Sequence, residues 1–331
     1  MSAIPLVRVQ GTHREVGRQL GAATADTVRR AAAGPFDADL VQRYREVTEL
    51  HLPWLVDELD GIAEGSGVEP LAVFATSIEE LAAAPEPAPT RCTDLAACGT
   101  AAADGHVLVA HNNDLAASDE EDVVAIEWRV PGEPTCFTLG VGPWISVGWN
   151  DAGLSLTGNE LAPGDEQVGI PRLLQVRDVL TRRTMDEAVE AVLHPARASS
   201  YNWVLAHRDG GLVNVEGTAR DAELSGPSAG VLAHTNHYTH DRLLPLERST
   251  RVAGSRQRLC RAEQLLTERE GPITTDWLRA ALSDHEGPCR HGDADGTKTV
   301  FWCVADVTKG EIAYGRGTPC TSQAAVYRFG W

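Results

Sequence analysis

The stretch Val123-Val-Ala-Ile-Glu-Trp-Arg-Val-Pro-Gly-Glu-Pro-Thr-Cys-Phe-Thr-Leu-Gly-Val141 decides the fold. It contains two runs rich in β-branched and aromatic residues, 123–130 and 136–141, on either side of the turn dipeptide Pro131-Gly132. Two such runs joined by a short turn are typical of an antiparallel hairpin. We therefore expect the centre of the chain to form antiparallel sheet.

The flanking regions repeat this pattern and add helices. Strand-like runs separated by turn signals are found at 107–110, 146–149, 202–206 and 212–215, and a hairpin is expected at 299–305 and 310–314. Helical patterns cover most of the first 80 residues and recur at 170–193, 251–267 and 275–283. Strand runs joined by short turns, with helices before and between them, favour an α+β fold of antiparallel sheets with helices packed outside.

Composition and charge exclude several classes of protein. The chain has 331 residues, 43% hydrophobic and 23% charged, and these values exclude a disordered or fibrous protein. Its formal net charge of -18 repels phosphate backbones and anionic lipids, so neither nucleic acid nor a membrane is expected as a partner. No stretch approaches the roughly 20 apolar residues of a membrane span, and no secretory signal is recognisable. We therefore expect a cytoplasmic protein.

A proline-rich break precedes a candidate nucleophile. Residues 82–90 hold three prolines in nine positions and so form neither a helix nor a central strand. Taken alone, the break is most simply interpreted as a linker between domains. Cys92 follows it, and we expect its thiol on an accessible loop at the start of a strand. On this evidence alone a structural role for Cys92 is the stronger alternative.

The cysteines as a set do not indicate a disulfide framework or a zinc ribbon. They number seven, and no two have the CxxC spacing. Most of them are therefore expected to be small buried hydrophobic residues. No glycine-rich phosphate loop follows a strand, which disfavours a nucleotide-binding fold.

Polar residues cluster where apolar runs end. His111-Asn112-Asn113-Asp114 follows the run 107–110 and either caps a turn or lines a site. His234-Thr-Asn236-His237 follows another apolar run, with His240 three residues later. Zinc ligands are conceivable there, but no Cys or acidic pattern accompanies them, so the edge of a polar site is the favoured interpretation. Asparagines near strand ends supply donors that could stabilise an oxyanion.

Taken in order, these pieces resemble a known family over nearly the whole chain. The opening Gly11-x5-Gly17-x3-Gly21, the segment 59–67, an acidic residue at 79 or 80, Cys92-Thr93, Asn112-Asn113-Asp114, Ser199-Ser200-x-Asn202, Glu216, His234-Thr-Asn236-His237 and the closing Gly315-x-Gly317-x-Pro319-Cys320 are the elements that match. They are similar to the acyl-coenzyme A:6-aminopenicillanic acid acyltransferase family of N-terminal-nucleophile hydrolases. The sequence departs from the family pattern at Arg91, where glycine is familiar, and at Asn113, where the family has an aromatic residue.

The resemblance implies a four-layer αββα sandwich and an inactive precursor. The precursor would cleave itself between Arg91 and Cys92, giving chains 1–91 and 92–331. These would stay associated as a heterodimer and together form one αββα domain. The proline-rich stretch would then be the exposed cleavage loop rather than a linker.

The resemblance also implies roles for particular side chains. Cys92 would be the nucleophile, activated by its own α-amino group, because the reference pKa of that amine is about 7.7–8.0 and that of a thiol about 8.5. Asn236 would donate to the oxyanion, and Asp114 would orient the amine or thiol. Supporting positions are expected at Arg91, as the cleavage position, and at four further residues: Thr93, Asn112, His234 and Arg290. No metal and no cofactor are expected.

The expected activity is cleavage or formation of an amide bond in a small N-acyl compound through a Cys92 thioester. The partners would then be a small acyl-amine substrate and the chain's own cleaved fragment, with acyl-coenzyme A as a candidate donor. Three alternatives stay open at this point. They are a dedicated acyl transferase of secondary metabolism, a binding scaffold without turnover, and a histidine-type metal hydrolase.

Overall fold

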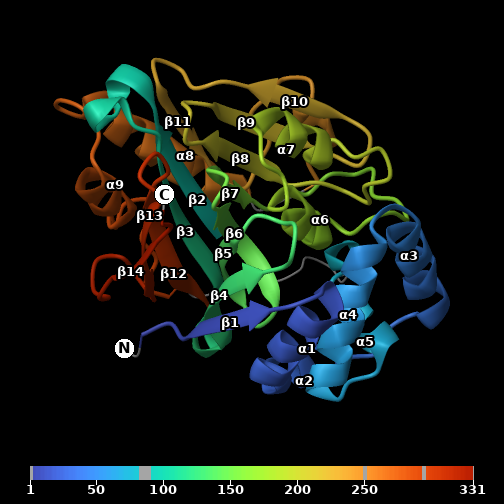
Figure 1. Ribbon diagram of the computed structural model, residues 1–331. Helices are drawn as coiled ribbons and strands as arrows, with labels where there is room; N and C mark the ends of the chain where they lie inside the picture. The colour runs from blue at the N-terminus through green and yellow to red at the C-terminus, as the bar shows by residue number, and fades with distance from the viewer. Residues whose placement is uncertain (1–2, 82–90, 249–251, 293–295, 331) are drawn as a thin grey trace.

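The computed structural model describes residues 3–81, 91–248, 252–292 and 296–330 (Figure 1). Its first sheet has the strand order β1-β4-β5-β6-β7-β8-β9-β10. The strand bounds are β1 Leu6–Gln10, β4 Val123–Arg129, β5 Cys136–Val141, β6 Trp144–Asn150, β7 Leu154–Asn159, β8 Asn202–His207, β9 Leu212–Gly217 and β10 Ala222–Ser225. The predicted central hairpin is therefore β4–β5, and its strands pair antiparallel.

The second sheet has the order β11-β2-β3-β12-β13-β14, and its described pairs are all antiparallel. Its strands are β2 Arg91–Ala97, β3 Leu108–Ala116, β11 Val231–His234, β12 Thr297–Asp306, β13 Glu311–Arg316 and β14 Ala325–Arg328. The helices that cover the sheets are α1 His13–Ala23, α2 Ala25–Ala31, α3 Ala38–His51, α4 Pro53–Ser66, α5 Pro70–Ala75, α6 Arg172–Val179, α7 Met185–Val192, α8 Val252–Glu268 and α9 Thr275–Leu282.

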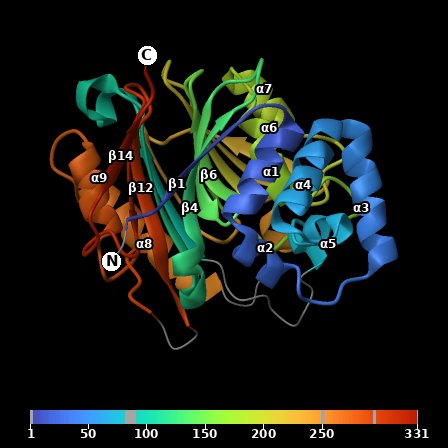
Figure 2. The same ribbon diagram turned by 60° about the horizontal axis from the view of Figure 1, so that its bottom comes forward.

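Figure 2 shows the four layers edge-on. Three apolar cores fill the spaces between them, and the middle core lies between the two sheets. Side chains alternate along each strand, so β4 sends Val123 and Ala125 toward the second sheet and Val124 and Ile126 toward the helices. The core on that outer face joins the first sheet to α1–α7. A third core joins the second sheet to α8 and α9. The expected αββα sandwich is confirmed.

The first strand, β1, was missed by the sequence analysis, which assigned the first 80 residues mostly to helix. β1 pairs in parallel with β4, with Leu6 opposite Ala125 and Gln10 opposite Arg129. Five residues are too few for a reliable periodic signal, and the partner strand lies more than a hundred residues away. The segment before residue 82 is thus built into the sheet as well as packed on it.

Glycines let α1 and α4 approach each other to backbone contact. A Cβ atom at Gly17 would lie 2.0 Å from the carbonyl oxygen of Glu58, and one at Gly61 would lie 2.2 Å from that of Arg14. Gly21 and Gly65 are equally tight. Larger residues do not fit at these positions, which explains why each helix has two glycines four residues apart on the face that meets the other helix.

Two further differences concern boundaries. The segment 170–193 is two helices, α6 and α7, rather than one, because Thr184 starts α7 with its own capping box. The proline-rich stretch 82–90, interpreted as a linker or a cleavage loop, lies outside the described residues. Among the helices that the structure does describe, none has both the length and the apolar character needed to span a membrane.

Candidate active site

Cys92 lies inside the second sheet rather than on a loop. It is the second residue of β2, faces Asn113 of β3 in register, and is only 5% exposed. The expectation of an accessible thiol is therefore wrong for the uncleaved chain, because Arg91 continues the strand by pairing with Asp114. The other predicted feature, a position at the very start of a strand, is correct.

A pocket opens beside Cys92, lined by residues of both sheets and of α6. Its volume is about 90 Å³, and its wall includes Cys92 and Asn113 from the second sheet. The apolar part of the wall is made by Leu115 of β3, by Ile145, Leu156 and Trp203 of the first sheet, and by Leu173 and Val176 of α6. The polar part of the wall consists of Glu79, Ser146, Thr157, Asn159, Glu160, Tyr201 and Asn202. The thiol thus borders a small cavity with both apolar and hydrogen-bonding walls.

Asn236 and Arg258 hold the backbone of Cys92. The amide nitrogen of Cys92 donates to Oδ1 of Asn236 at 2.6 Å, and Nη2 of Arg258 donates to the same oxygen at 2.7 Å. Arg258 Nη2 also lies 3.4 Å from the carbonyl oxygen of Cys92. The side-chain nitrogen of Asn236 donates to the carbonyl oxygen of Glu160 at 3.2 Å. The predicted Cys92–Asn236 pair is therefore brought together by the fold.

His111 and Asp94 form a buried pair next to the thiol. His111 Nδ1 lies 3.0 Å from Asp94 Oδ1, and the Cys92 side chain also hydrogen bonds to His111. Burial disfavours the charged ring, but the Asp94 carboxylate and Cys92 outweigh it and raise the pKa of His111 to about 10. The interpretation of 111–114 as a turn cap is wrong, since these residues lie within β3 and are buried.

Asp114 is fully buried on the opposite face of the sheet from the thiol. Alternation along β3 sends it, with Asn112, toward α8 and α9. Its Oδ1 accepts from Thr299 Oγ1 at 2.6 Å. Burial raises the pKa of Asp114 to about 6, although the positive charge of Arg258 acts in the other direction. Asp114 therefore interacts electrostatically with Arg258, the residue that contacts the backbone of Cys92.

Three predicted supporting residues, Thr93, Asn112 and Arg290, make hydrogen bonds on the side of the second sheet that faces α8 and α9. Thr93 Oγ1 accepts from Arg258 Nε at 3.3 Å. Asn112 Nδ2 donates to the carbonyl oxygens of Leu282 and Pro288, at 2.9 and 3.0 Å, and so holds the loop after α9. Arg290, on that loop, donates from its backbone nitrogen to Thr299 Oγ1 at 3.1 Å, and its carbonyl oxygen accepts from the backbone nitrogen of Thr299 at 2.9 Å. Thr299 is also the partner of Asp114.

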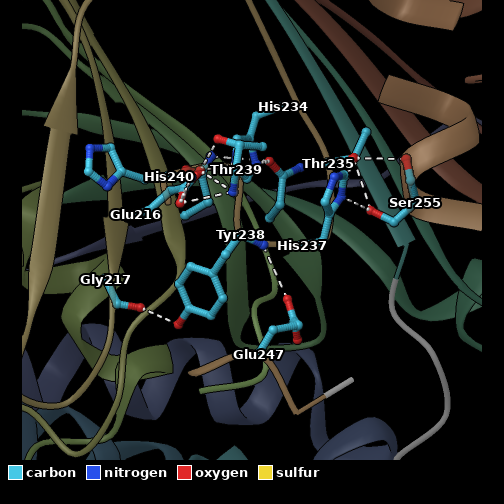
Figure 3. A network of polar contacts seen from close by, with 12 residues as sticks. Glu216, Gly217, His234, Thr235, His237, Tyr238, Thr239, His240, Glu247 and Ser255 are labelled. Carbon is cyan, nitrogen blue, oxygen red and sulfur yellow. Dashed lines mark hydrogen bonds and ion pairs between the residues drawn. The ribbon is translucent and has the colours of Figure 1, made fainter. Parts of the chain in front are cut away.

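His234 joins a different polar network, drawn in Figure 3. Its Nδ1 lies 2.9 Å from Asn159 Oδ1 and its Nε2 lies 3.0 Å from Glu216 Oε1. The His234 hydrogen bond and those from Thr239 and His240 outweigh the effect of burial and lower the pKa of Glu216 to about 2. Both ring nitrogens of His234 thus have protein partners, one of which, Asn159, lies in the pocket wall.

The histidines at 234, 237 and 240 do not converge on one point. His237 Nδ1 pairs with Ser255 Oγ at 2.8 Å, and burial lowers the pKa of His237 to about 4. His240 is exposed and lies near Glu223. The alternative of a metal hydrolase built on these three histidines therefore loses its structural basis.

The segment that ends at residue 81 reaches the pocket wall. Arg172 donates from Nε to Glu79 Oε2 at 2.8 Å and from Nη2 to Glu160 Oε1 at 2.6 Å. Glu80 accepts from the backbone of Arg172 and from Ser199, and burial raises the pKa of Glu80. Both acidic residues at 79 and 80 thus anchor the N-terminal segment to the part of the chain that follows Cys92.

Arg258, which contacts both the carbonyl oxygen of Cys92 and the side chain of Asn236, was not predicted from the sequence. It is 2% exposed, and burial lowers its pKa to about 10, so it carries a positive charge at neutral pH. A signal was present in α8, where Arg258 falls on the stripe that buries Ser255, Leu259, Ala262 and Leu266. A charged residue in the middle of a buried helical stripe indicates a specific partner.

Comparison with known families identifies the chain. The family model described as acyl-coenzyme A:6-aminopenicillanic acid acyl-transferase matches residues 101–319. The chain belongs to this family. As a family member it is an enzyme of the N-terminal-nucleophile type, an amide hydrolase or acyltransferase. The matched range includes Asp114, Asn236 and Arg258 and begins after Cys92.

Solved structures show distant similarity to this family member. A variant of the conjugated bile acid hydrolase from Clostridium perfringens is 14% identical, with a TM-score of 0.48, over 72% of this chain and 97% of that one. The penicillin V acylase from Agrobacterium tumefaciens is 16% identical, with a TM-score of 0.46, over 71% and 84%. No curated protein sequence matches the chain.

The raised pKa of Asp114 predicts an acidic limb in the pH profile of this family member. Asp114 is protonated below about pH 6 and ionised above it. We expect kcat/KM to rise as pH increases through about 6, because only the carboxylate can balance the charge of Arg258 beside Cys92. The measurement is kcat/KM between pH 5 and pH 8.

Asp114→Asn keeps this position neutral at every pH, so its rate should stay low and show no limb near pH 6. Asp119→Asn, which changes a partly exposed acid on another segment, should keep the limb. An unchanged limb and rate in Asp114→Asn would assign the titration to another group.

Proposed function

We propose that the enzyme matures by self-cleavage between Arg91 and Cys92 and then acts on the amide bond of a small N-acyl compound through a Cys92 thioester. The observation that carries this proposal is the arrangement around Cys92. Its side chain borders the pocket and His111, while Asn236 and Arg258 hold its backbone nitrogen and oxygen. A thiol fixed at a backbone position beside a substrate-sized cavity is what both reactions need.

In the maturation step, Cys92 Sγ attacks the carbonyl carbon of Arg91. The peptide C–N bond between Arg91 and Cys92 then breaks, and the proton of the thiol passes to the departing nitrogen. This gives a thioester that water hydrolyses to the Arg91 carboxylate and the free thiol. The buried His111–Asp94 pair supports the step, because a protonated imidazole beside the sulfur stabilises negative charge that develops during the attack.

In the mature enzyme, the nitrogen of Cys92 becomes an α-amino group. Asn236 Oδ1, which accepts from this nitrogen in the uncleaved chain, would orient the amine toward the thiol. The amine takes the thiol proton, the thiolate attacks the substrate carbonyl, and the amine product leaves with that proton. Water then completes hydrolysis, or a bound amine completes acyl transfer.

Chain 1–91 is proposed to stay bound to chain 92–331 after cleavage. It contributes β1 to the first sheet, its helices share the outer core of that sheet, and Glu79 forms part of the pocket wall. The paired Glu79, Glu80 and Arg172 connect it to the other side of the cleavage position. The pocket is thus complete only with both chains present.

The size and lining of the pocket favour a short aliphatic acyl group. A cavity of about 150 Å³ holds a benzene ring, and this pocket measures about 90 Å³. Leu156, Leu173 and Val176 supply its apolar wall, and Asn159 and Tyr201 supply polar groups for the amide. We propose hydrolysis as the main outcome, since water is always present whereas transfer requires a bound acceptor.

The experiment is a partition measurement. Activated thioesters and amides of acyl groups of increasing length are supplied with and without candidate amines, and acid and amide products are quantified. We expect acid as the main product, with rates that fall for aromatic acyl groups, and an acyl adduct on the peptide beginning at Cys92. Amide in large excess at millimolar amine would instead assign a transferase. If neither acid nor amide forms with any member of the panel, the alternative of a binding scaffold without turnover is supported.

A further inference from the structure

Four side chains outside the pocket meet at one point of the second sheet's outer side. His285, Cys289 and His291 lie on the loop that follows α9, and Cys320 lies on the connection between β13 and β14. One ligand atom from each of them lies within 4.8 Å of those of the other three. None of the four lines the pocket beside Cys92. The set therefore needs an explanation separate from the active site.

Four of the six separations lie close to the edges of a metal-centred tetrahedron, and all six are within 4.8 Å. With Zn–S bonds of about 2.3 Å and Zn–N bonds of about 2.0–2.1 Å, a tetrahedron has S–S edges of about 3.8 Å, N–N edges of about 3.3 Å and S–N edges of about 3.5 Å. Cys289 Sγ lies 3.6 Å from Cys320 Sγ, and His285 Nε2 lies 3.3 Å from His291 Nε2. His291 Nε2 lies 3.7 Å from Cys289 Sγ and 3.2 Å from Cys320 Sγ.

Contacts outside the cluster hold its two loops in place. The backbone nitrogen of Cys289 donates to the carbonyl oxygen of Asp284 at 2.9 Å, and the Asp284 carboxylate binds Arg261 of α8. On the other loop, Arg279 of α9 donates to the carbonyl oxygens of Pro319 and Ser322. The four ligand atoms are thus brought together by the fold, which lowers the entropic cost of binding a metal ion.

We propose that His285, Cys289, His291 and Cys320 bind one Zn²⁺ ion. Two thiols and two imidazoles form a Cys₂His₂ set, which suits zinc and excludes the oxygen-preferring Mg²⁺ and Ca²⁺. The two cysteines bind as thiolates, so a thiol that is still protonated loses its proton when the ion binds. Cys289 is buried while the other three residues are exposed, so the ion can enter from solvent.

Four protein ligands leave no open position, so the site is structural. Its location gives it a role in supporting the active-site face. Cys289 and His291 flank Arg290, whose backbone pairs with Thr299, and Thr299 donates to Asp114. The ion would fix this loop and thereby the hydrogen-bond partner of Asp114.

The expectation of no metal rested on the missing CxxC spacing and on the histidines at 234–240. The ligands here are spaced His-x3-Cys-x-His, and the fourth comes from a loop 29 residues further on. The sequence analysis treated Cys320 only as part of a closing family element.

The test measures metal content and coordination in the full chain purified under reducing conditions with zinc present. We expect about one zinc per chain in the wild type and at least a tenfold lower content in Cys320→Ser and His291→Ala. Cys260→Ser, at an exposed cysteine of α8 outside the cluster, should keep its zinc. Chelation should lower the melting temperature of the wild type and of Cys260→Ser but leave that of Cys320→Ser unchanged.

A second measurement covers the case that a variant fails to fold. Co²⁺ added to metal-free wild type should give the intense visible bands of a tetrahedral ion together with a thiolate charge-transfer band. A wild type without these bands and without bound zinc would overturn the proposal. So would a Cys289–Cys320 disulfide that persists under reductant, or a zinc content equal in the wild type and Cys320→Ser.

Discussion

Cys92→Ala is expected to remain a single chain of full length and to have no activity. The wild type should separate under denaturing conditions into fragments of about 10 and about 26 kDa, in proportion to residues 1–91 and 92–331 of the 35.5 kDa chain. Without a thiol at position 92, the group proposed to attack both the Arg91 carbonyl and a substrate carbonyl is missing. Mass spectrometry of the intact protein, followed by the amide assay, measures both effects.

The control for this prediction is another cysteine. Cys260→Ala changes an exposed thiol of α8 and should cleave and turn over like the wild type. If the wild type stays uncleaved and is nevertheless active, the maturation proposal fails while Cys92 can remain the nucleophile. If Cys92→Ala is active, both proposals fail.

Asn236→Ala is expected to reduce kcat by about 10²–10³-fold with a much smaller change in KM. The residue contacts the nitrogen of Cys92 through Oδ1, and its Nδ2 group, which donates to the carbonyl oxygen of Glu160, is the donor proposed for the oxyanion. Removing a donor that acts mainly in the transition state lowers kcat rather than substrate affinity. Steady-state kinetics on the best substrate of the panel give the two constants.

Asn236→Asp separates the two functions of the amide group. Asp keeps an oxygen for Cys92 and Arg258, so self-cleavage should continue, but it lacks the NH₂ donor, so turnover should stay slow. Asn214→Ala removes a buried Asn from β9 outside the pocket and should leave kcat nearly unchanged. Normal turnover in Asn236→Asp would show that Asn236 positions the α-amino group and that another group stabilises the oxyanion.

Local sequence patterns predicted antiparallel strands with helices packed outside them, and the family resemblance added the four layers. The β-rich runs of β4 and β5 and the helical segments of α8 and α9 are local signals, and the structure confirms them. The strand β1 could not be found in this way. Its stability comes from pairing with β4, a contact between distant parts of the chain that no local pattern records.

The same distinction applies to the site. Cys92 and Asn236 could be proposed because family motifs mark both positions, and the structure brings them within hydrogen-bonding distance. For His111 the sequence left open a turn cap or the lining of a site, because polar residues often end strands, whereas in the structure Asp94 on the neighbouring strand pairs with its ring. Arg258 lacks a family motif, and its place in the buried stripe of α8 indicates a partner but does not identify it; the packing of α8 against β2 shows that the partners are Thr93 and Cys92.

The position of β1 has a consequence for the cleaved protein. β1 is the outermost strand of the first sheet and covers the hydrogen-bonding groups of β4 on that side. If chain 1–91 were lost, β4 would become a bare edge next to an uncovered apolar face that includes Ile126 and Trp128. An exposed edge of this kind pairs readily with other chains and leads to aggregation. We therefore expect chain 1–91 to protect the enzyme from aggregation also after the proposed cleavage, because it keeps the edge of β4 covered.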